Sequence, residues 1–241
     1  MLKLVRVEAK LFLREGASVI FAILFPTVLL LVLGAIPALR TPDPMFGGTR
    51  FIDGYAGTLV VITLAFLGLQ RVPTTVATYR ERGVLRRLST TPLHPGKLLA
   101  AQLLVNLIAA VVAVLLVVAV GRLVFDIGLP HHLVGFTLTV LLGAASLFSF
   151  GLVIAALAST AKAAAGWATV AFMLVMFFGG AYLPRFLLPD AVNTVGQYLP
   201  PGVAALQDSW VGTAPSPPHL AVMAVIALLA GTVAARTFRW E

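Results

Sequence analysis

The chain has 241 residues, of which 60% are hydrophobic and only 11% are charged, and its formal net charge is +8. A soluble domain is about a quarter charged, so this composition excludes a water-soluble globule and requires lipid around much of the surface. The basic residues lie in short segments between apolar runs, which argues against nucleic-acid binding. Because cysteine is absent, disulfides, thiolate metal sites and a catalytic thiol are also excluded.

Apolar stretches long enough to cross a bilayer recur six times along the chain. A membrane core needs about 20 mainly apolar residues in a helix, and the alternating polarity of a transmembrane barrel is not seen. We therefore expect an all-α integral membrane protein with a single transmembrane domain over residues 1–241. The six spans are expected at 17–37, 54–71, 98–121, 133–159, 163–184 and 219–236.

The first span has one alternative interpretation, a cleaved signal peptide. Basic residues precede it, and the small residues Gly34 and Ala35 follow. Its apolar run is longer than the roughly 7–15 residues usual in such peptides, which favours a membrane span.

The distribution of Lys and Arg predicts the orientation in the membrane. If both termini face the cytoplasm, only four of the 17 basic residues lie outside, which leaves 13 inside. Cytoplasmic loops carry such an excess of positive charge. We therefore expect a multi-pass protein of the bacterial plasma membrane with both termini cytoplasmic. The four outer residues are Arg40, Arg50, Arg122 and Arg185.

The segment before the first span has the pattern of an amphipathic helix. Its four cations fall on one side of a helical wheel beside an apolar stripe, so the segment is expected to lie in the cytoplasmic interface against anionic lipid headgroups. A frayed, merely basic start to the first span is the alternative. The cations are Lys3, Arg6, Lys10 and Arg14, and the stripe is Leu2, Val5, Ala9, Phe12 and Leu13.

Residues 71–97 form the longest predicted cytoplasmic connection. Val84, Leu85 and Leu88 share one face of a short helix, and Pro92 and Pro95 end it. The arginines Arg82, Arg86 and Arg87 point elsewhere. A docking element for a partner protein has this form, although a positive-inside topology signal would explain the charge alone.

The segment 183–218 is expected outside the membrane. Its prolines separate short apolar runs, which could form short helices that dip into the outer interface. A plain extracellular loop is the alternative, but more than thirty residues without structure would be unusually long.

The motifs of enzymes and ion-coupled carriers are missing from the sequence. It has no phosphate-binding loop, so ATP hydrolysis is not expected in this chain, and no catalytic residues are predicted. His131 and His132 are more typical of a solvated loop than of a metal site. The predicted spans have no charged residue at their centres, which argues against an ion-driven carrier.

Polar residues inside the spans are few and uncharged. Each is more typical of a hydrogen bond between helices than of a substrate contact, but a transport pathway would draw on the same positions. The fifth span is rich in Phe, Met and Leu, and such a wall would suit a hydrophobic or amphiphilic substrate. The candidates for pathway residues are Thr63, Asn106, Ser149 and Phe177.

Three stretches of the sequence resemble the membrane subunit of type-2 ATP-binding-cassette exporters, the permease family that includes bacterial daunorubicin-type drug exporters. They are YRERGVLRRLSTTPLHPGKLL at 79–99, GLVIAALAST at 151–160, and GGAYLP at 179–184 with the Leu-Pro and Tyr-Leu-Pro groups that follow. Together with the six spans, the resemblance covers nearly the whole chain, and the order and spacing of the three stretches make it fairly specific. The sequence departs from the family at Leu199-Pro200-Pro201, where Asn-Pro is frequent, and at Gln207-Asp208, where a basic residue is frequent.

The resemblance implies that this chain is half of a transporter. A second permease subunit, identical or different, would complete the pathway, and two cytosolic ABC ATPase subunits would bind ATP and Mg²⁺, so no cofactor is expected in this chain. The N-terminal helix would lie against the same ATPase. The coupling helix in the ATPase cleft would comprise Arg82, Gly83, Leu85, Arg86, Leu88 and Pro92.

The implied activity is ATP-driven export, including multidrug export, of a hydrophobic drug, antibiotic or lipid. The same family architecture also exports polysaccharide and glycolipid chains, which is the first alternative. A passive channel that needs no ATPase is the second, and a membrane-embedded enzyme is the third.

Overall fold

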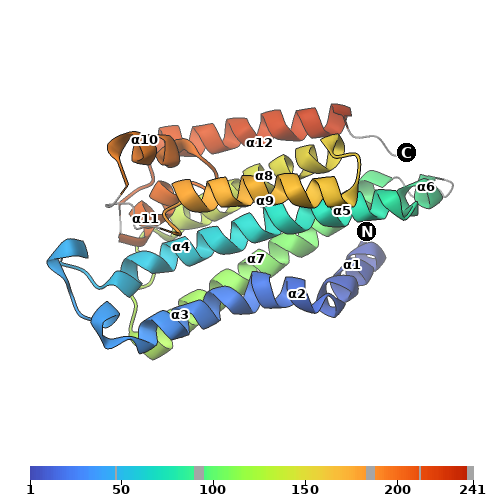
Figure 1. Cartoon of the computed structure of the whole chain (residues 1–241). Helices are drawn as coiled ribbons and strands as arrows, with labels where there is room; N and C mark the ends of the chain where they lie inside the picture. Colours follow the sequence, from blue (N-terminus) through green and yellow to red (C-terminus); the bar gives the residue numbers. More distant parts are fainter. Residues whose placement is uncertain (47, 90–94, 183–187, 212, 238–241) are drawn as a thin grey trace.

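The computed structural model describes residues 1–46, 48–89, 95–182, 188–211 and 213–237, and every regular element in them is a helix (Figure 1). Within these residues, six helices are long and apolar enough to cross a membrane. The predicted all-α membrane fold with six candidate spans is therefore confirmed. These six helices are Gly16–Ala35, Phe51–Glu81, Gly96–Phe125, Leu133–Leu157, Ala161–Phe178 and Pro217–Thr237.

The first half of the chain contains the N-terminal helix and the first two spans. Its elements are α1 (Leu2–Arg14), α2 (Gly16–Val19), the π-helical η1 (Ile20–Leu24), α3 (Phe25–Ala35), the 3₁₀ turns η2 (Pro37–Arg40) and η3 (Pro44–Phe46), α4 (Phe51–Ala65), the π-helical η4 (Phe66–Arg71), α5 (Val72–Glu81) and α6 (Val84–Ser89). The π-helical turn η1 lies just before Pro26, which has no backbone N–H to donate within the helix.

The described residues of the second half form four long helices and two short ones. They are α7 (Pro95–Phe125), α8 (Leu133–Leu157), α9 (Ala161–Phe178), α10 (Asp190–Tyr198), α11 (Val203–Val211) and α12 (Pro217–Thr237). The fifth span ends at Phe178, short of the predicted residue 184, and Gly180 follows with a φ of 71° that favours glycine.

The second span differs most from its prediction. The helix does not end at residue 71 but continues through η4 and α5 to Glu81. Val72, Val76 and Ala77 are buried because α5 packs against α8 and α9. Arg71, Arg80 and Glu81 fall within the predicted cytoplasmic connection, but the structure places them in this continuous helix of the bundle.

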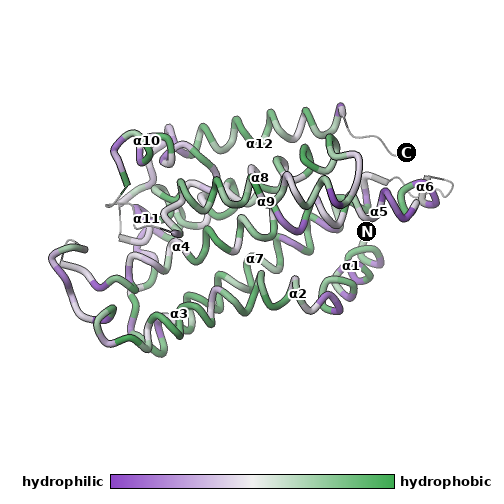
Figure 2. Tube along the Cα trace, viewed as in Figure 1, coloured by the Kyte–Doolittle hydropathy of each residue, from purple (hydrophilic) through white to green (hydrophobic). Residues whose placement is uncertain are grey.

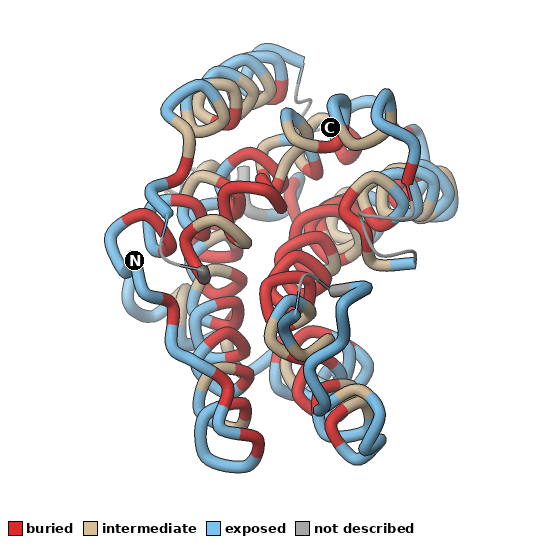
Figure 3. The backbone as a smooth tube through the Cα atoms, turned by 90° about the vertical axis from the view of Figure 1, so that its left-hand side faces the viewer, coloured by how far each residue is buried: buried red, intermediate tan, exposed pale blue. Residues whose placement is uncertain are grey.

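This second span is the centre of the fold. In its apolar stretch 78% of the residues are buried, compared with 22% in the first span, 17% in the fifth and 11% in the sixth. Figure 3 shows the same contrast, with buried backbone inside the bundle and exposed backbone around it. The apolar first, fifth and sixth spans leave wide surfaces for lipid or for another membrane subunit.

The two ends of the bundle have different elements. The start of α1, the helix α6 and the end of α12 lie at one end, whereas α10, α11 and the turns η2 and η3 lie at the other (Figure 1). Hydrophilic residues gather at both ends and the middle is mainly apolar (Figure 2). The start of α1, the end of α12 and the predicted docking element therefore share one end of the molecule.

Candidate functional site

The short helix α6 projects from the end of the bundle beyond α5. Gly83 makes the sharp turn between the two helices with a φ of 66°, and its N–H donates to the Arg80 carbonyl at 3.0 Å. Arg82, Arg86 and Arg87 are exposed on this turn and helix. Pro92 lies outside the described residues, as does the side chain of Leu88. The exposed part of the predicted coupling element is thus cationic.

Leu85 lies differently from the sequence-based expectation. It is only 1% exposed, because α6 turns this face toward the bundle and contacts α5 and α7. In this chain Leu85 therefore fixes α6 to the bundle, and among the described side chains of the turn and of α6 the exposed ones are arginines.

Helix α1 packs against α7 and has a mixed outer surface. Glu8 and Phe12 are buried, whereas the predicted interfacial cations Lys3, Arg6, Lys10 and Arg14 are all exposed. Part of the predicted apolar stripe faces the bundle, but Leu2 and Leu13 are exposed, as are Val7 and Leu11. Exposed apolar residues beside exposed cations are what a helix in a membrane interface needs.

Arg71 is the centre of a polar cluster within the second span. Its Nη1 donates to Asn106 Oδ1 at 3.2 Å, its Nη2 pairs with Glu15 Oε2 at 3.2 Å, and its guanidinium lies 4.5 Å from the centre of the Phe12 ring. The side chain is only 6% exposed. A buried arginine without such partners would be strongly destabilising, so these contacts hold α1 and α7 against the central helix.

Glu8 is a second point at which α1 is fastened to the central helix. The Tyr79 hydroxyl donates to both of its carboxylate oxygens at 3.2 Å. Burial raises the pKa of the Glu8 carboxyl above its ordinary value, while hydrogen bonding to Tyr79 and the positive charge of Arg71 oppose that rise. Glu8 thus joins the N-terminal helix to Tyr79, near the C-terminal end of α5.

The raised pKa of Glu8 predicts a pH-dependent stability. The folded chain binds the proton more tightly than the unfolded chain, so this contribution is complete below the unfolded pKa of about 4.3 and is lost as pH rises through the raised folded pKa. Glu8→Gln, which mimics the neutral acid, should melt at nearly the wild-type temperature at low pH and above it near neutrality. Melting curves in detergent from pH 4 to 8 would measure this, and parallel wild-type and variant profiles would refute it.

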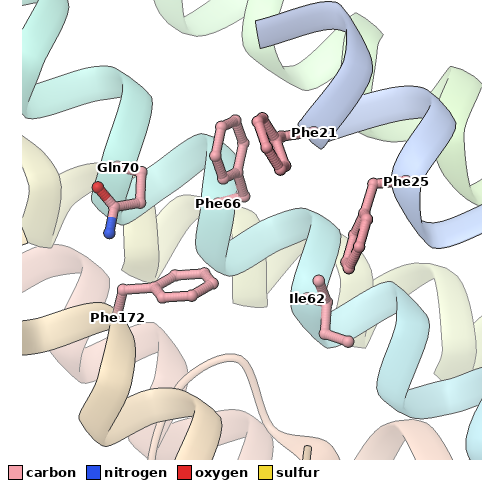
Figure 4. A pocket seen from close by; sticks show the side chains of 6 residues that line it. All are labelled: Phe21, Phe25, Ile62, Phe66, Gln70 and Phe172. Carbon is pink, nitrogen blue, oxygen red and sulfur yellow. The ribbon is translucent and has the colours of Figure 1, made fainter. Parts of the chain in front are cut away.

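A groove of about 300 Å³ opens between the first, second and fifth spans. In Figure 4, Phe21 and Phe66 stand side by side, Phe172 approaches from α9, and the Gln70 amide lies at one end. The rings of Phe21 and Phe66 are 5.8 Å apart. Gln70 supplies the polar group among the lining residues, and its Nε2 lies 3.5 Å from Thr169 Oγ1. The described lining residues are Phe21, Phe25, Ile62, Phe66, Gln70 and Phe172.

The four predicted pathway residues do not gather in this groove. Thr63 is fully buried and donates to Leu59 of its own helix, and Asn106 belongs to the Arg71 cluster. Ser149 is half-buried beside Gly231 of α12, and Phe177 is exposed on α9. Their dispersal leaves the aromatic groove as the better candidate for a substrate path.

Sequence reasoning missed the polar contacts that join the helices. No sequence pattern gives a site role to Arg71, Glu8 or Glu15, and Tyr79, Arg80 and Glu81 are recognisable only as part of the motif at 79–99. One signal was available, because Glu8 is the single acidic residue on an otherwise cationic helix. An acidic residue in that setting suggests a buried partner.

Comparison with known proteins gives two consistent findings. Residues 2–203 match the family described as ABC-2 type transporter. The chain is also 24% identical over 194 residues to the Bacillus subtilis (strain 168) protein YvfS, whose name describes it as a transport permease. That similarity covers 80% of this chain and 77% of YvfS.

Proposed function

The chain belongs to the ABC-2 type transporter family, and on that premise we propose that it is the membrane half of an ATP-driven exporter of hydrophobic or amphiphilic molecules. Membership makes it a permease, the membrane subunit of an ABC transporter, and implies an ABC ATPase as its partner. The substrate class, the outward direction and the assembly with a second permease subunit are the proposal.

The aromatic groove is the observation that carries the substrate class. Its described walls offer the faces of Phe21, Phe66 and Phe172 with one amide, Gln70. Aromatic and apolar walls with a single hydrogen-bonding group suit a lipophilic or amphiphilic molecule, such as a drug, an antibiotic or a lipid. They offer little to a long, heavily hydroxylated polysaccharide.

A second permease subunit would close this groove. The groove lies between the first and fifth spans, whose residues are mostly not buried in the single chain. The partner can be a second copy or a different chain. Lipid would cover the apolar surface that remains, and the cations of α1 would face anionic headgroups.

The cytosolic end would receive the ATPase. We place both termini and α6 in the cytoplasm of a bacterial cell, with the exposed arginines of α6 set against acidic groups of an ATPase subunit. Two such subunits would bind ATP and Mg²⁺ and close on each other. Movement of α6 would then open the groove toward the outer side.

Charge reversal on α6 tests the docking surface. The double variant Arg82→Glu/Arg86→Glu should reduce the ATPase recovered with the tagged chain from native membranes by roughly tenfold or more, since juxtaposed like charges cost several kcal/mol. The recovered protein would be identified by mass spectrometry through its phosphate-binding loop, and the activity of the eluate would be measured as ATP hydrolysis.

Arg236→Glu is the matched control, because Arg236 is exposed near the end of α12 at the same end of the molecule. It should leave ATPase recovery unchanged. Equal losses of ATPase recovery in both variants would show that the loss follows from the changed net charge and not from the arginines of α6. Recovery of no ATPase with the wild-type chain would count against the whole proposal.

A further inference from the structure

We propose that Arg80 and Glu81 are positioning residues that carry movement of α6 to α9, and thereby to the groove wall that bears Phe172. The inference rests on the proposed function, because it takes α6 as the docking element and the groove as the substrate path. It adds a specific connection between the two.

Arg80 and Glu81 hold opposite sides of one short turn. The Arg80 guanidinium donates to the carbonyl of Ala155 at 3.0 Å and also to that of Ala158, at the C-terminal end of α8. The Glu81 carboxylate accepts the Ala161 N–H at 2.6 Å, at the first residue of α9. Two adjacent side chains of α5 therefore form hydrogen bonds to the end of α8 and to the start of α9.

The charges suit the helix ends that they meet. A cation is favoured beside the free carbonyls at a helix C-terminus, and an anion beside the free N–H groups at an N-terminus. Hydrogen bonds to ionised groups are also about twice as strong as neutral ones. The pair is thus oriented so that each charge stabilises its own helix end, and exchanging the two residues would oppose both.

Small residues let the turn approach α5 closely. Ala77 of α5, Ala158 of the turn and Ala164 of α9 form a buried cluster, and Ala161 and Ala163 pack against it. Thr160 Oγ1 also accepts the Ala163 N–H at 3.0 Å and so caps α9. Only three residues connect α8 to α9, so this short turn cannot move far without moving the start of α9.

The mechanical consequence reaches the groove. α6 follows α5 after only Arg82 and Gly83, and α9 continues as one helix from Ala161 to Phe172. A displacement of the α5–α6 junction would therefore move the base of α9. The adjacent Tyr79 contacts a different element, α1, through Glu8. Neighbouring residues thus connect the α5–α6 junction to α9, which carries Phe172, and to α1, which precedes the first span.

The test uses the absence of native cysteine. Met173 is 55% exposed and follows Phe172 on α9, so Met173→Cys can be labelled singly with an environment-sensitive bimane fluorophore. The complex with its co-purified ATPase is placed in lipid nanodiscs, and bimane emission is read before and after ATP and Mg²⁺. We expect a spectral shift in this background and its loss in Arg80→Ala/Glu81→Ala, with ATPase recovery and basal ATP hydrolysis kept.

Tyr79→Phe is the matched control, since it removes a neighbouring tether to α1 and should leave the Met173 shift intact. If the double variant folds poorly, Glu81→Gln, which keeps an acceptor but loses the charge, should give a reduced shift. A full shift in the double variant would overturn the inference, as would an equal loss in Tyr79→Phe or a loss of ATPase recovery in the double variant. Failure of the parent chain to bind any ATPase would instead reject the proposed function.

Discussion

Replacing Gly151 with alanine is expected to reduce the yield of folded, membrane-inserted protein sharply. Gly151 of α8 crosses the central helix at Gly68, and a Cβ atom at Gly151 would overlap with the Gly68 carbonyl oxygen. The neighbouring atom is backbone and cannot rotate away, so the helices must separate. Overpacking costs about 1–3 kcal/mol, and we expect the upper end here because small residues set such close helix contacts in membranes.

Gly166→Ala is the control for this substitution. Gly166 lies on α9, where an added Cβ would meet no atom within 4 Å, and alanine favours helix over glycine by up to about 1 kcal/mol. Size-exclusion chromatography of fluorescently tagged protein, followed by thermal melting, should separate the two variants. Similar yields and melting temperatures for both would show that the Gly151–Gly68 crossing does not determine packing.

Arg71→Ala is expected to have the second large effect. It would leave Asn106 without its charged donor and Glu15 without its cation, and it would remove the guanidinium from the face of Phe12. Because Glu15 is itself 53% exposed, the main losses are the buried hydrogen bond to Asn106 and the contact with the Phe12 ring. A hydrogen bond to a charged group contributes about 1.5–3 kcal/mol, which corresponds to a fall in melting temperature of roughly 3–12 °C for a chain of this size. Loss of α1 packing should accompany it, measurable as faster proteolysis near the N-terminus.

Arg122→Ala is the matched arginine variant at the surface. Arg122 pairs with Asp126 at 2.5 Å, but the two side chains are 51% and 82% exposed, and such pairs contribute about 1 kcal/mol or less. Its melting temperature should therefore stay close to that of the wild type. If Arg71→Ala melts no lower than Arg122→Ala, the Arg71 cluster does not fasten α1 to the bundle.

The sequence predicted the parts of the fold that depend on local composition. Six apolar runs specify six spans because a bilayer sets their length. The extension of the second span to Glu81 could not be read in this way. From the sequence, Arg71 has the charge expected of a residue at the membrane boundary. Its hydrogen-bond partner Asn106 lies 35 residues further along the chain, and only the packed bundle shows that the two are neighbours.

The candidate site was predicted only in part, for the same reason. The helical wheel can group the cations of α1, since that grouping is a property of one helix. The wheel could not say which face of α6 meets the bundle, and Leu85 proved to be buried. The groove brings together Phe21, Phe66 and Phe172 from three distant segments, and only the packed bundle shows that they meet.

The position of α6 relative to the membrane tests the central claim most directly, because a cytosolic ATPase can bind this helix only from the cytoplasmic side. A single Arg86→Cys in this cysteine-free chain would be exposed to a membrane-impermeant maleimide in sealed right-side-out vesicles, with Leu129→Cys, which is exposed in the α7–α8 connection, as the outer reference. We expect Leu129→Cys to react at once and Arg86→Cys only after the vesicles are permeabilised. Labelling of Arg86→Cys in sealed vesicles would place α6 outside the cell and contradict its role as the docking element of an ABC transporter.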